Sequence, residues 1–286
     1  MMKTIVEVNN ITFRYQRKGQ PLFDNFSIRL EDGHVYGLLG KNGTGKSTLL
    51  YLISGLLYPQ RGDIRFMGND VRSRLPENLG DMFIVPEEYD LPPMSLSNYI
   101  RANRPFYPKF SDEVLRSCLE EFEMPADLNL KELSMGQKKK VYLSIALAAG
   151  TRLLLMDEPT NGLDIPSKML FRRVVANHLS DERTLLLSTH QVHDVETLLD
   201  HVMILDRRNL LLDASMAELT SRYRFVYTMP GESAGEVLYA EPTLQGNASL
   251  LHRRDGDEET QVNLELLFNA VNEGKLKHDS LSPQNI

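Results

Sequence analysis

The stretch Gly40-Lys41-Asn42-Gly43-Thr44-Gly45-Lys46-Ser47 decides the fold of this chain. An apolar run over 35–39 precedes it and predicts a buried parallel strand, while residues 47–53 predict the start of a helix. This strand, glycine-rich loop and helix together form the context that a phosphate-binding P-loop requires. Glycine lets successive backbone N–H groups point inward around phosphates, and the helix adds its unpaired N–H groups. The sequence therefore predicts a P-loop NTPase fold of the α/β class.

The side chains of this loop predict how ATP and its metal ion are held. We expect Lys46 to contact the β- and γ-phosphates and the Ser47 hydroxyl to bind Mg²⁺. The remaining residues expected to contact ATP in and after the loop are Gly40, Asn42, Gly43, Thr44, Gly45 and Thr48. The alternative is a glycine-rich turn that carries an exposed lysine.

A pair of acids follows a second apolar run, Leu153-Leu154-Leu155-Met156. Asp157 is expected to hold Mg²⁺ through water, and Glu158 to take a proton from, or polarise, the attacking water. The alternative is two acids that cap the next turn. Because Pro159 and the turn residues after it follow at once, and because the P-loop is present, the catalytic interpretation is favoured.

The segment Leu133-Ser134-Met135-Gly136-Gln137 opens a predicted helix. A serine N-cap beside a glycine presents a hydroxyl and free N–H groups at the positive end of that helix, which predicts a second anion site. An ordinary helix cap is the alternative. The lysines at 138–140 are expected to form a solvated helix face.

Composition limits the class of protein. The 286 residues fit one large nucleotide-binding domain with a small appendage, and the formal net charge of −7 argues against a nucleic-acid partner. The single Cys118 excludes an internal disulfide and is typical of the reducing cytoplasm. We expect no secretory signal, and no apolar run approaches the roughly 18 residues that a membrane span needs.

The pattern along the chain predicts its domains. Residues 3–30 predict antiparallel strands, residues 86–150 a helical subdomain, and residues 153–205 a return to alternating strands and helices, with a helix over 192–199. From residue 221 the chain predicts short strands and a closing helix. We therefore expect an ATPase domain over 1–220 and a small C-terminal α/β accessory domain over 221–286.

From about Val6 to Leu212 the chain resembles the nucleotide-binding subunit of an ATP-binding cassette (ABC) transporter, with the motifs in the family's order. Gly40–Ser47 match Walker A, Leu133–Gln137 the signature and Leu153–Glu158 Walker B. The resemblance implies that the catalytic residues are Lys46, Glu158 and His190, the last being the switch histidine. It also implies ATP contacts from Tyr15, which stacks on adenine, and from Ser134, Gly136 and Gln137 of the signature. Asn161–Asp164 match the D-loop, in which Asp164 is expected to contact ATP.

Two positions depart from the family pattern. Glu87 stands where the family has a glutamine that contacts Mg²⁺, and as an ionised carboxylate it only accepts hydrogen bonds. Glu87 is therefore expected as a metal ligand beside Ser47 and Asp157. Met135 replaces the usual glycine of the signature. Together with the lysines after it and Phe106-Tyr107-Pro108, it is similar to the bacterial exporter-type subfamily.

The resemblance implies the partners and the place of action. A homodimer or heterodimer of nucleotide-binding subunits is expected to hydrolyse MgATP and to drive transport through a separate integral-membrane permease, which holds the substrate site. The chain would then be peripheral on the cytoplasmic face of the cell membrane. The alternatives are a soluble ABC ATPase that acts on ribosomes or DNA, and a regulatory cassette without turnover.

Overall fold

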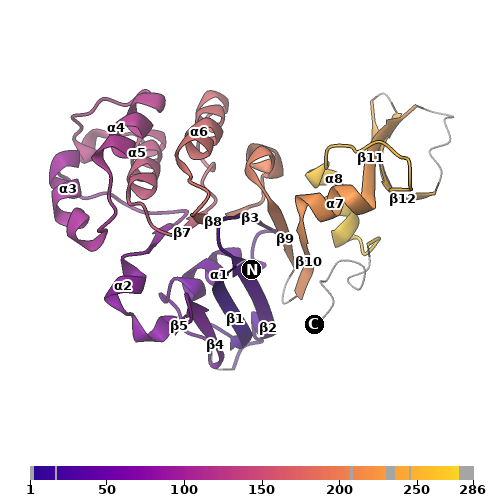
Figure 1. Ribbon diagram of the computed structural model, residues 1–286, viewed down its shortest axis with the longest axis horizontal. Helices are drawn as coiled ribbons and strands as arrows, with labels where there is room; N and C mark the ends of the chain where they lie inside the picture. Colours follow the sequence, from indigo (N-terminus) through magenta and orange to yellow (C-terminus); the bar gives the residue numbers. More distant parts are fainter. Residues whose placement is uncertain (1–2, 17, 207–208, 230–235, 245, 277–286) are drawn as a thin grey trace.

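A six-stranded sheet forms the centre of the molecule (Figure 1). The computed structural model describes residues 3–16, 18–206, 209–229, 236–244 and 246–276. From one edge to the other the strands are β10 (Asn209–Ser215), β9 (His201–Asp206), β3 (Val35–Leu39), β8 (Thr184–Thr189), β7 (Leu153–Asp157) and β6 (Met82–Val85). Only the pairing of β10 with β9 is antiparallel. The expected parallel sheet is confirmed, whereas β10 was not predicted.

Alternate side chains of the central strands enter two different cores. In β7, Leu153 and Leu155 belong to one buried cluster, and Leu154 and Met156 belong to the other. The same alternation holds in β8 and β9, because successive side chains of a strand point to opposite faces. Both faces of the sheet are therefore covered, as is usual for parallel sheets.

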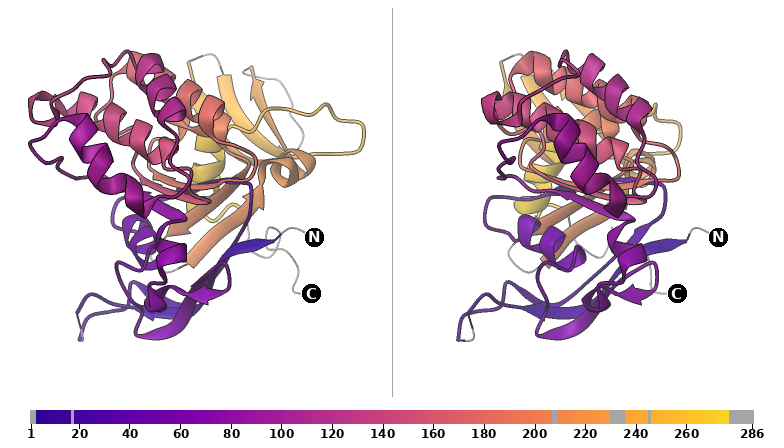
Figure 2. Two further views of the ribbon diagram at one scale, coloured as in Figure 1. Left: turned by 60° about the vertical axis from the view of Figure 1, so that its left-hand side comes forward. Right: turned by 90° about the vertical axis from the view of Figure 1, so that its left-hand side faces the viewer.

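An antiparallel sheet and helix α1 (Lys46–Ile53) cover the first face. Figures 1 and 2 show this indigo sheet below the central one. Its strands run in the order β2 (Phe23–Glu31), β1 (Thr4–Phe13), β4 (Arg61–Phe66) and β5 (Asn69–Asp70). The expected antiparallel subdomain at the N-terminus is confirmed.

Helices cover the second face of the central sheet, and Figure 1 shows α5 and α6 among them. The helices on this face are α3 (Leu96–Asn103), α4 (Asp112–Glu121), α5 (Met135–Ala148) and α6 (Ile165–His178), with 3₁₀ turns at Arg104–Phe106 and Leu130–Glu132. The short helix α2 (Pro76–Leu79) has no buried residue, and the 3₁₀ turn Val71–Ser73 places Val71 in the core of the first face. The helical insertion agrees with the expectation for 86–150. The helix predicted over 192–199 is wrong: the segment forms two 3₁₀ turns, Val192–Asp194 and Glu196–Leu198, and is too short for stable α-helical turns.

The C-terminal part joins the edge of the central sheet at β10. After α7 (Met216–Arg222), strands β11 (Tyr223–Thr228), β12 (Val237–Thr243) and β13 (Gly246–His252) form a small antiparallel sheet, which α8 (Leu264–Asn272) accompanies. Helix α8 also contacts β9 and β10, and Leu250 and Leu267 share the buried cluster of Val202. We propose that the ATPase domain ends near residue 220 and that a small C-terminal domain follows it, although the two parts share one core.

Candidate nucleotide site

Three adjacent parallel strands bring the predicted site to one edge of the central sheet. Strand β8 lies between β3 and β7, with Leu39 opposite Thr189 and Ser188 opposite Asp157. The residues that follow these strand ends therefore lie close together. This carboxyl edge is where open α/β sheets bind their ligands.

The loop after β3 has the backbone of a phosphate cradle. Gly43 and Gly45 have positive φ angles of 81° and 108°. A Cβ atom on Gly45 would also lie 2.9 Å from the ring of Phe23, so glycine is required there for both reasons. Gly45 caps α1 without a side-chain hydrogen bond, which leaves the first N–H groups of the helix open to an anion.

Lys46 directs its ammonium group back into this loop. Its Nζ donates hydrogen bonds to the carbonyl oxygens of Gly40 at 2.8 Å and Lys41 at 3.3 Å. The same atom lies 3.5 Å from Glu158 Oε1, and both side chains are buried. Lys46 therefore joins the P-loop to the end of β7.

Glu158 lies between Lys46 and His190. Its Oε1 is 2.9 Å from His190 Nδ1 as well as 3.5 Å from Lys46 Nζ, and its Oε2 accepts the His190 backbone N–H at 3.3 Å. The backbone of Glu158 has a left-handed φ of 45°, and its N–H donates to the carbonyl of Ser188 at 3.0 Å. The three predicted catalytic side chains are thus brought together.

Asp157 is buried beside hydroxyl groups. Burial raises the pKa of Asp157, and hydrogen bonds from Ser188 and Ser47 lower it again in part. The carboxylate and the Ser47 hydroxyl are hard oxygen donors of the type that Mg²⁺ takes, so they fit this ion. Ser188 was missed in the sequence, although a polar residue that ends a buried strand beside Asp157 was a usable signal.

Tyr15 follows β1 and stands at the rim of the site. Its side chain is exposed to 67 %, its hydroxyl shares a 2.8 Å hydrogen bond with Thr48 Oγ1, and Phe13 contacts its ring edge to face. The predicted adenine contact and the first turn of α1 are therefore neighbours. With this exposure, the Tyr15 ring is accessible to a flat ligand.

Comparison with known proteins gives the family. A zinc uptake system ATP-binding protein, ZurA of Listeria innocua, is 31 % identical over 76 % of this chain and 88 % of its own length. The chain belongs to the ABC transporter family. The family description "ABC transporter" matches residues 23–161, and a Nod factor export ATP-binding protein of Cupriavidus metallidurans is 30 % identical over 76 % of this chain and 73 % of its own. A solved ATP-binding subunit of an ABC transporter superposes with a TM-score of 0.68 at 25 % identity, over 75 % of this chain and 91 % of that one.

The chain is therefore the ATP-binding subunit of an ABC transporter, and its transport-coupled activity is ATP hydrolysis. This assignment agrees with the order of motifs in the sequence. It also removes the alternative of an ATPase that acts on ribosomes or DNA. The roles of the individual residues rest on the geometry of the site.

The ABC signature begins α5 as a complete capping box. Ser134 Oγ accepts the backbone N–H of Gln137 at 3.3 Å, and Gln137 Oε1 accepts the N–H of Ser134 at 3.0 Å. Gly136 lies beside Gly162 of the D-loop, since a Cβ atom on Gly136 would be 3.9 Å from the Gly162 carbonyl oxygen. These signature residues thus contact one another and the D-loop, and Ser134 and Gln137 remain exposed.

The D-loop ends at Asp164, which caps α6. Its Oδ1 accepts the Ser167 N–H at 2.9 Å, and this hydrogen bonding lowers the pKa of Asp164. The apolar side chains of Met135 and Ile165 near these loops are exposed to 79 % and 85 %. The signature and the D-loop therefore form one exposed surface with uncovered apolar groups.

Glu87 contacts the D-loop. Its Oε1 accepts a hydrogen bond from the Asn161 side-chain amide at 2.8 Å, and the rest of its carboxylate is exposed. Strand β6 pairs with β7, with Val85 opposite Met156, so Glu87 and Asp157 follow neighbouring strands at the same edge of the sheet. Glu87 thus lies at the edge of the sheet where the metal site is expected, with Asn161 as its hydrogen-bond partner.

The expectation of a solvated face for the lysines at 138–140 is wrong for Lys139. This side chain is buried, and its Nζ donates to the carbonyl oxygens of Glu158 at 3.1 Å and Asn161 at 2.8 Å. Lys138 instead forms an exposed pair with Asp90. The helical spacing could have indicated that Lys139 is buried, because it precedes the buried Leu143 by one turn.

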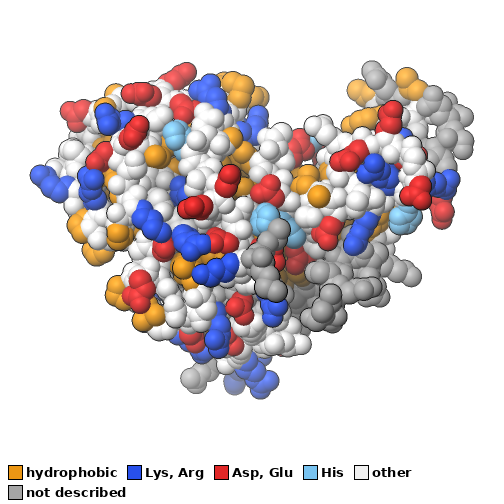
Figure 3. All heavy atoms as spheres, in the orientation of Figure 1, with side chains coloured by type: hydrophobic (Ala, Val, Ile, Leu, Met, Phe, Trp, Pro, Cys, Tyr) orange, Lys and Arg blue, Asp and Glu red, His pale blue; other side chains and the backbone are white. Residues whose placement is uncertain are grey.

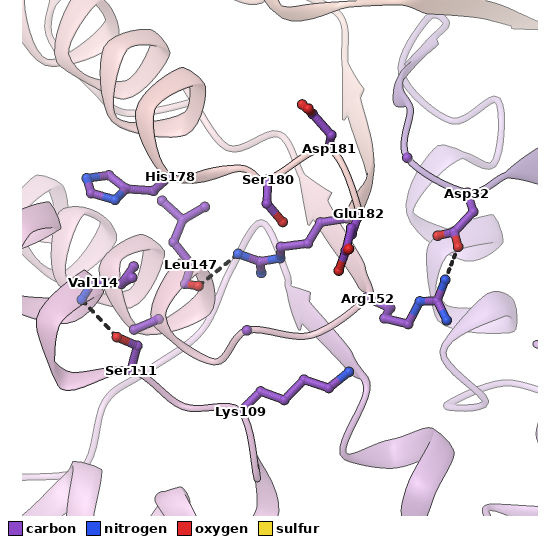
Figure 4. Close-up of a pocket in the computed structure, with 14 residues that line it drawn as sticks. Asp32, Lys109, Ser111, Val114, Leu147, Arg152, His178, Ser180, Asp181 and Glu182 are labelled. Atoms are coloured by element: carbon purple, nitrogen blue, oxygen red, sulfur yellow. Dashed lines mark hydrogen bonds and ion pairs between the residues drawn. The ribbon is translucent and has the colours of Figure 1, made fainter.

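A polar cavity of about 770 Å³ lies at the opposite, amino ends of β3, β7 and β8 (Figure 4). Its cations are already paired: Lys109 with Asp81 and Arg152 with Asp32. The buried Arg183 donates to three backbone carbonyl groups, and burial lowers its pKa to about 10. Lys109 and Arg183 join the helical insertion to the sheet, and Arg152 joins the segments before β7 and β3, so we assign the cavity a structural role.

Proposed function

We propose that ATP hydrolysis in this chain depends on Glu158, His190 and Lys46. The observation that carries the proposal is the position of Glu158 Oε1 between Lys46 Nζ and His190 Nδ1. Glu158 accepts a proton from the attacking water while the bond between the β- and γ-phosphates breaks. Lys46 and the P-loop amides stabilise the charge of the transferred phosphoryl group, and His190 donates a hydrogen bond to it.

We propose that the nucleotide is bound by Tyr15, by the P-loop and by Thr48. The exposed ring of Tyr15 at the rim of the site supports stacking on adenine. The positive φ angles at Gly43 and Gly45 support a ring of inward N–H groups around the phosphates. The carbonyl partners of Lys46 are weaker acceptors than a phosphate, so its ammonium is available to the β- and γ-phosphates.

We propose Ser47, Asp157 and Glu87 as the residues that hold Mg²⁺. When bound, this ion neutralises phosphate charge and orients the phosphate oxygens. Asp157 supplies a buried carboxylate whose hydrogen bonds from Ser47 and Ser188 orient it. The position of Glu87 after β6, the strand beside the one that ends at Asp157, supports a third oxygen ligand.

Glu87→Gln tests this metal contact. The amide oxygen of glutamine can still accept the Asn161 hydrogen bond, so the variant removes the charge and keeps the contact. ATP affinity in EDTA should improve by about 3- to 10-fold, because one like charge near the γ-phosphate is removed, whereas affinity in excess Mg²⁺ should change less than about twofold. Calorimetric titration with ATP under both conditions measures this. Glu88→Gln controls for net charge, and an equal shift in the two conditions contradicts the metal contact.

We propose that two such subunits face each other to hydrolyse ATP, as a homodimer or as a heterodimer with a related cassette. The exposed surface formed by the signature and the D-loop supports this arrangement. The side chains of Ser134, Gln137 and Asp164 are exposed there, and the half-buried Gly136 lies beside Gly162. Uncovered Met135, Ile165 and Met169 add apolar area to it. In this dimer the signature of one subunit completes the phosphate site of the other.

We propose a separate integral-membrane permease as the transport partner, with this chain on the cytoplasmic face of the membrane. No helix among the described residues is long and apolar enough for a membrane span. The relatives include proteins named for export and proteins named for uptake. We therefore propose that the permease determines both the direction of transport and the substrate.

An apolar groove between α2 and the helical insertion is the proposed contact with the permease. The groove has a volume of about 870 Å³, and Leu56, Leu79 and Phe106 along it are exposed to 55 %, 39 % and 68 %. Figure 3 shows hydrophobic side chains gathered over this part of the molecule. Its wall includes β6, which leads directly into Glu87, so an occupant would contact an element of the nucleotide site.

Phe106→Asp tests the groove. A charge in the groove should reduce binding of the subunit to washed membranes of the producing cells by about 10-fold or more, because an ionised carboxylate cannot be desolvated there without a partner. ATP hydrolysis by the isolated chain should stay within about twofold. Leu244→Asp, at a fully exposed apolar position in the turn between β12 and β13, is the control. Membrane binding that survives in Phe106→Asp excludes this surface.

A further inference from the structure

The buried ammonium group of Lys139 fastens helix α5 to the turn that carries Glu158. Its Nζ donates hydrogen bonds to two backbone carbonyl oxygens of this turn, those of Glu158 at 3.1 Å and Asn161 at 2.8 Å. Burial lowers the pKa of Lys139, and the charges of Glu87, Glu158 and Asp157 oppose that effect. A lysine is rarely buried without such partners, so its position needs the two carbonyl groups.

The Glu158 peptide has a backbone conformation that needs support. Its φ of 45° lies in the left-handed region, which is unfavourable for a residue with a side chain. Ser188 holds the N–H of Glu158, and Lys139 holds its carbonyl oxygen. The two contacts fix the residue from both sides, and the direction of the Glu158 side chain toward Lys46 and His190 follows from this backbone.

Lys139 also belongs to the helix that begins at the signature. It lies two residues beyond Gln137, in the second turn of α5, whose first turn starts at the exposed Ser134 cap. A shift or rotation of α5 therefore moves the donor that holds Glu158. The same turn is held a second time by the hydrogen bond from the Asn161 side chain to Glu87.

We propose that Lys139 is a positioning residue, which holds Glu158 in its catalytic orientation and ties that orientation to the helix of the signature. The inference rests on the proposed role of Glu158. It gives the signature helix a direct contact with the hydrolytic residue of its own chain. Lys139 itself touches neither the nucleotide nor the water.

Lys139→Met removes both hydrogen bonds and keeps the length of the apolar stem. We expect kcat for ATP hydrolysis to fall about 10- to 100-fold, because small displacements of a catalytic group have effects of this size, while KM for MgATP changes less than about threefold. Lys139→Arg keeps donors for the two carbonyl groups and should return kcat to within about fivefold of the original chain. Lys138→Met, on the same helical turn but in an exposed pair with Asp90, should stay within about twofold.

The double variant Lys139→Met/Glu158→Gln distinguishes positioning of Glu158 from a general stabilisation of the fold. Single-turnover hydrolysis of γ-labelled ATP is the measurement. In a Glu158→Gln background, Lys139→Met should cause no further loss, because the group that it positions is already absent. Losses that multiply, or an unchanged kcat in Lys139→Met alone, overturn the proposal. Normal turnover in Glu158→Gln instead removes the catalytic role of Glu158, which is a separate failure.

The thermal unfolding of each variant is measured together with its kinetics, to show whether the variant is folded. If Lys139→Met does not fold, Lys139→Gln replaces it, since its amide is too short for both carbonyl groups, and the same kcat and KM changes are expected. If neither variant folds, the proposal is overturned, because Lys139 is then needed for the stability of the fold and not for the position of Glu158.

Discussion

Glu158→Gln is expected to bind MgATP and to hydrolyse it about 10²- to 10⁴-fold more slowly, the usual size of a general-base effect. The amide cannot accept the proton of the attacking water. It has nearly the same shape as the carboxylate and can remain between Lys46 and His190, so the phosphate cradle stays intact. Phosphate release under saturating MgATP measures the loss.

The same variant tests the proposed dimer. Because ATP persists in the site, two subunits should remain closed around it, and Glu158→Gln with MgATP should elute as a dimer from a sizing column. Glu182→Gln, an exposed carboxylate in the loop before β8, is the control and should behave as the original chain. Turnover near the original rate in Glu158→Gln would remove Glu158 from its assigned role.

Lys46→Met is expected to lower kcat/KM for MgATP by about 10²- to 10³-fold, as for the loss of one well-oriented group that stabilises transition-state charge. In contrast to Glu158→Gln, it should also weaken ATP binding, because the ammonium group that meets the β- and γ-phosphates is absent. It further leaves the buried carboxylate of Glu158 without its lysine partner. Steady-state kinetics and nucleotide titration together measure both effects.

Lys275→Met replaces an exposed lysine far along the chain and serves as the matched control for Lys46→Met. Both kcat/KM and ATP affinity should be unchanged in this control. If Lys46→Met binds ATP as tightly as the original chain does, the ammonium group does not contact the phosphates, and the carbonyl groups of Gly40 and Lys41 are its partners with ATP bound as well.

The local features of the fold could be predicted from the sequence. The P-loop is a continuous segment whose glycines and flanking apolar runs prescribe strand, loop and helix, and the structure has β3 and α1 at these places. Period-two and period-3.6 patterns gave the antiparallel strands and the helical insertion. The segment 192–199 was predicted wrongly, because so short an apolar pattern does not separate an α-helix from 3₁₀ turns.

The residues by themselves determined the class of the site, because each motif is short and its chemistry follows from adjacent residues. Only the tertiary structure decided which motifs touch. Lys139 reaches Glu158 and Asn161, Ser188 holds Asp157, and the Asn161 amide meets Glu87 across 74 positions of sequence. A helical or strand period tells which face of an element is buried, but the partner on that face depends on how distant elements pack. The spacing of Lys139 from Leu143 was a signal of a buried face that the expectation of a solvated face missed, whereas the contact of Lys139 with Glu158 required the fold.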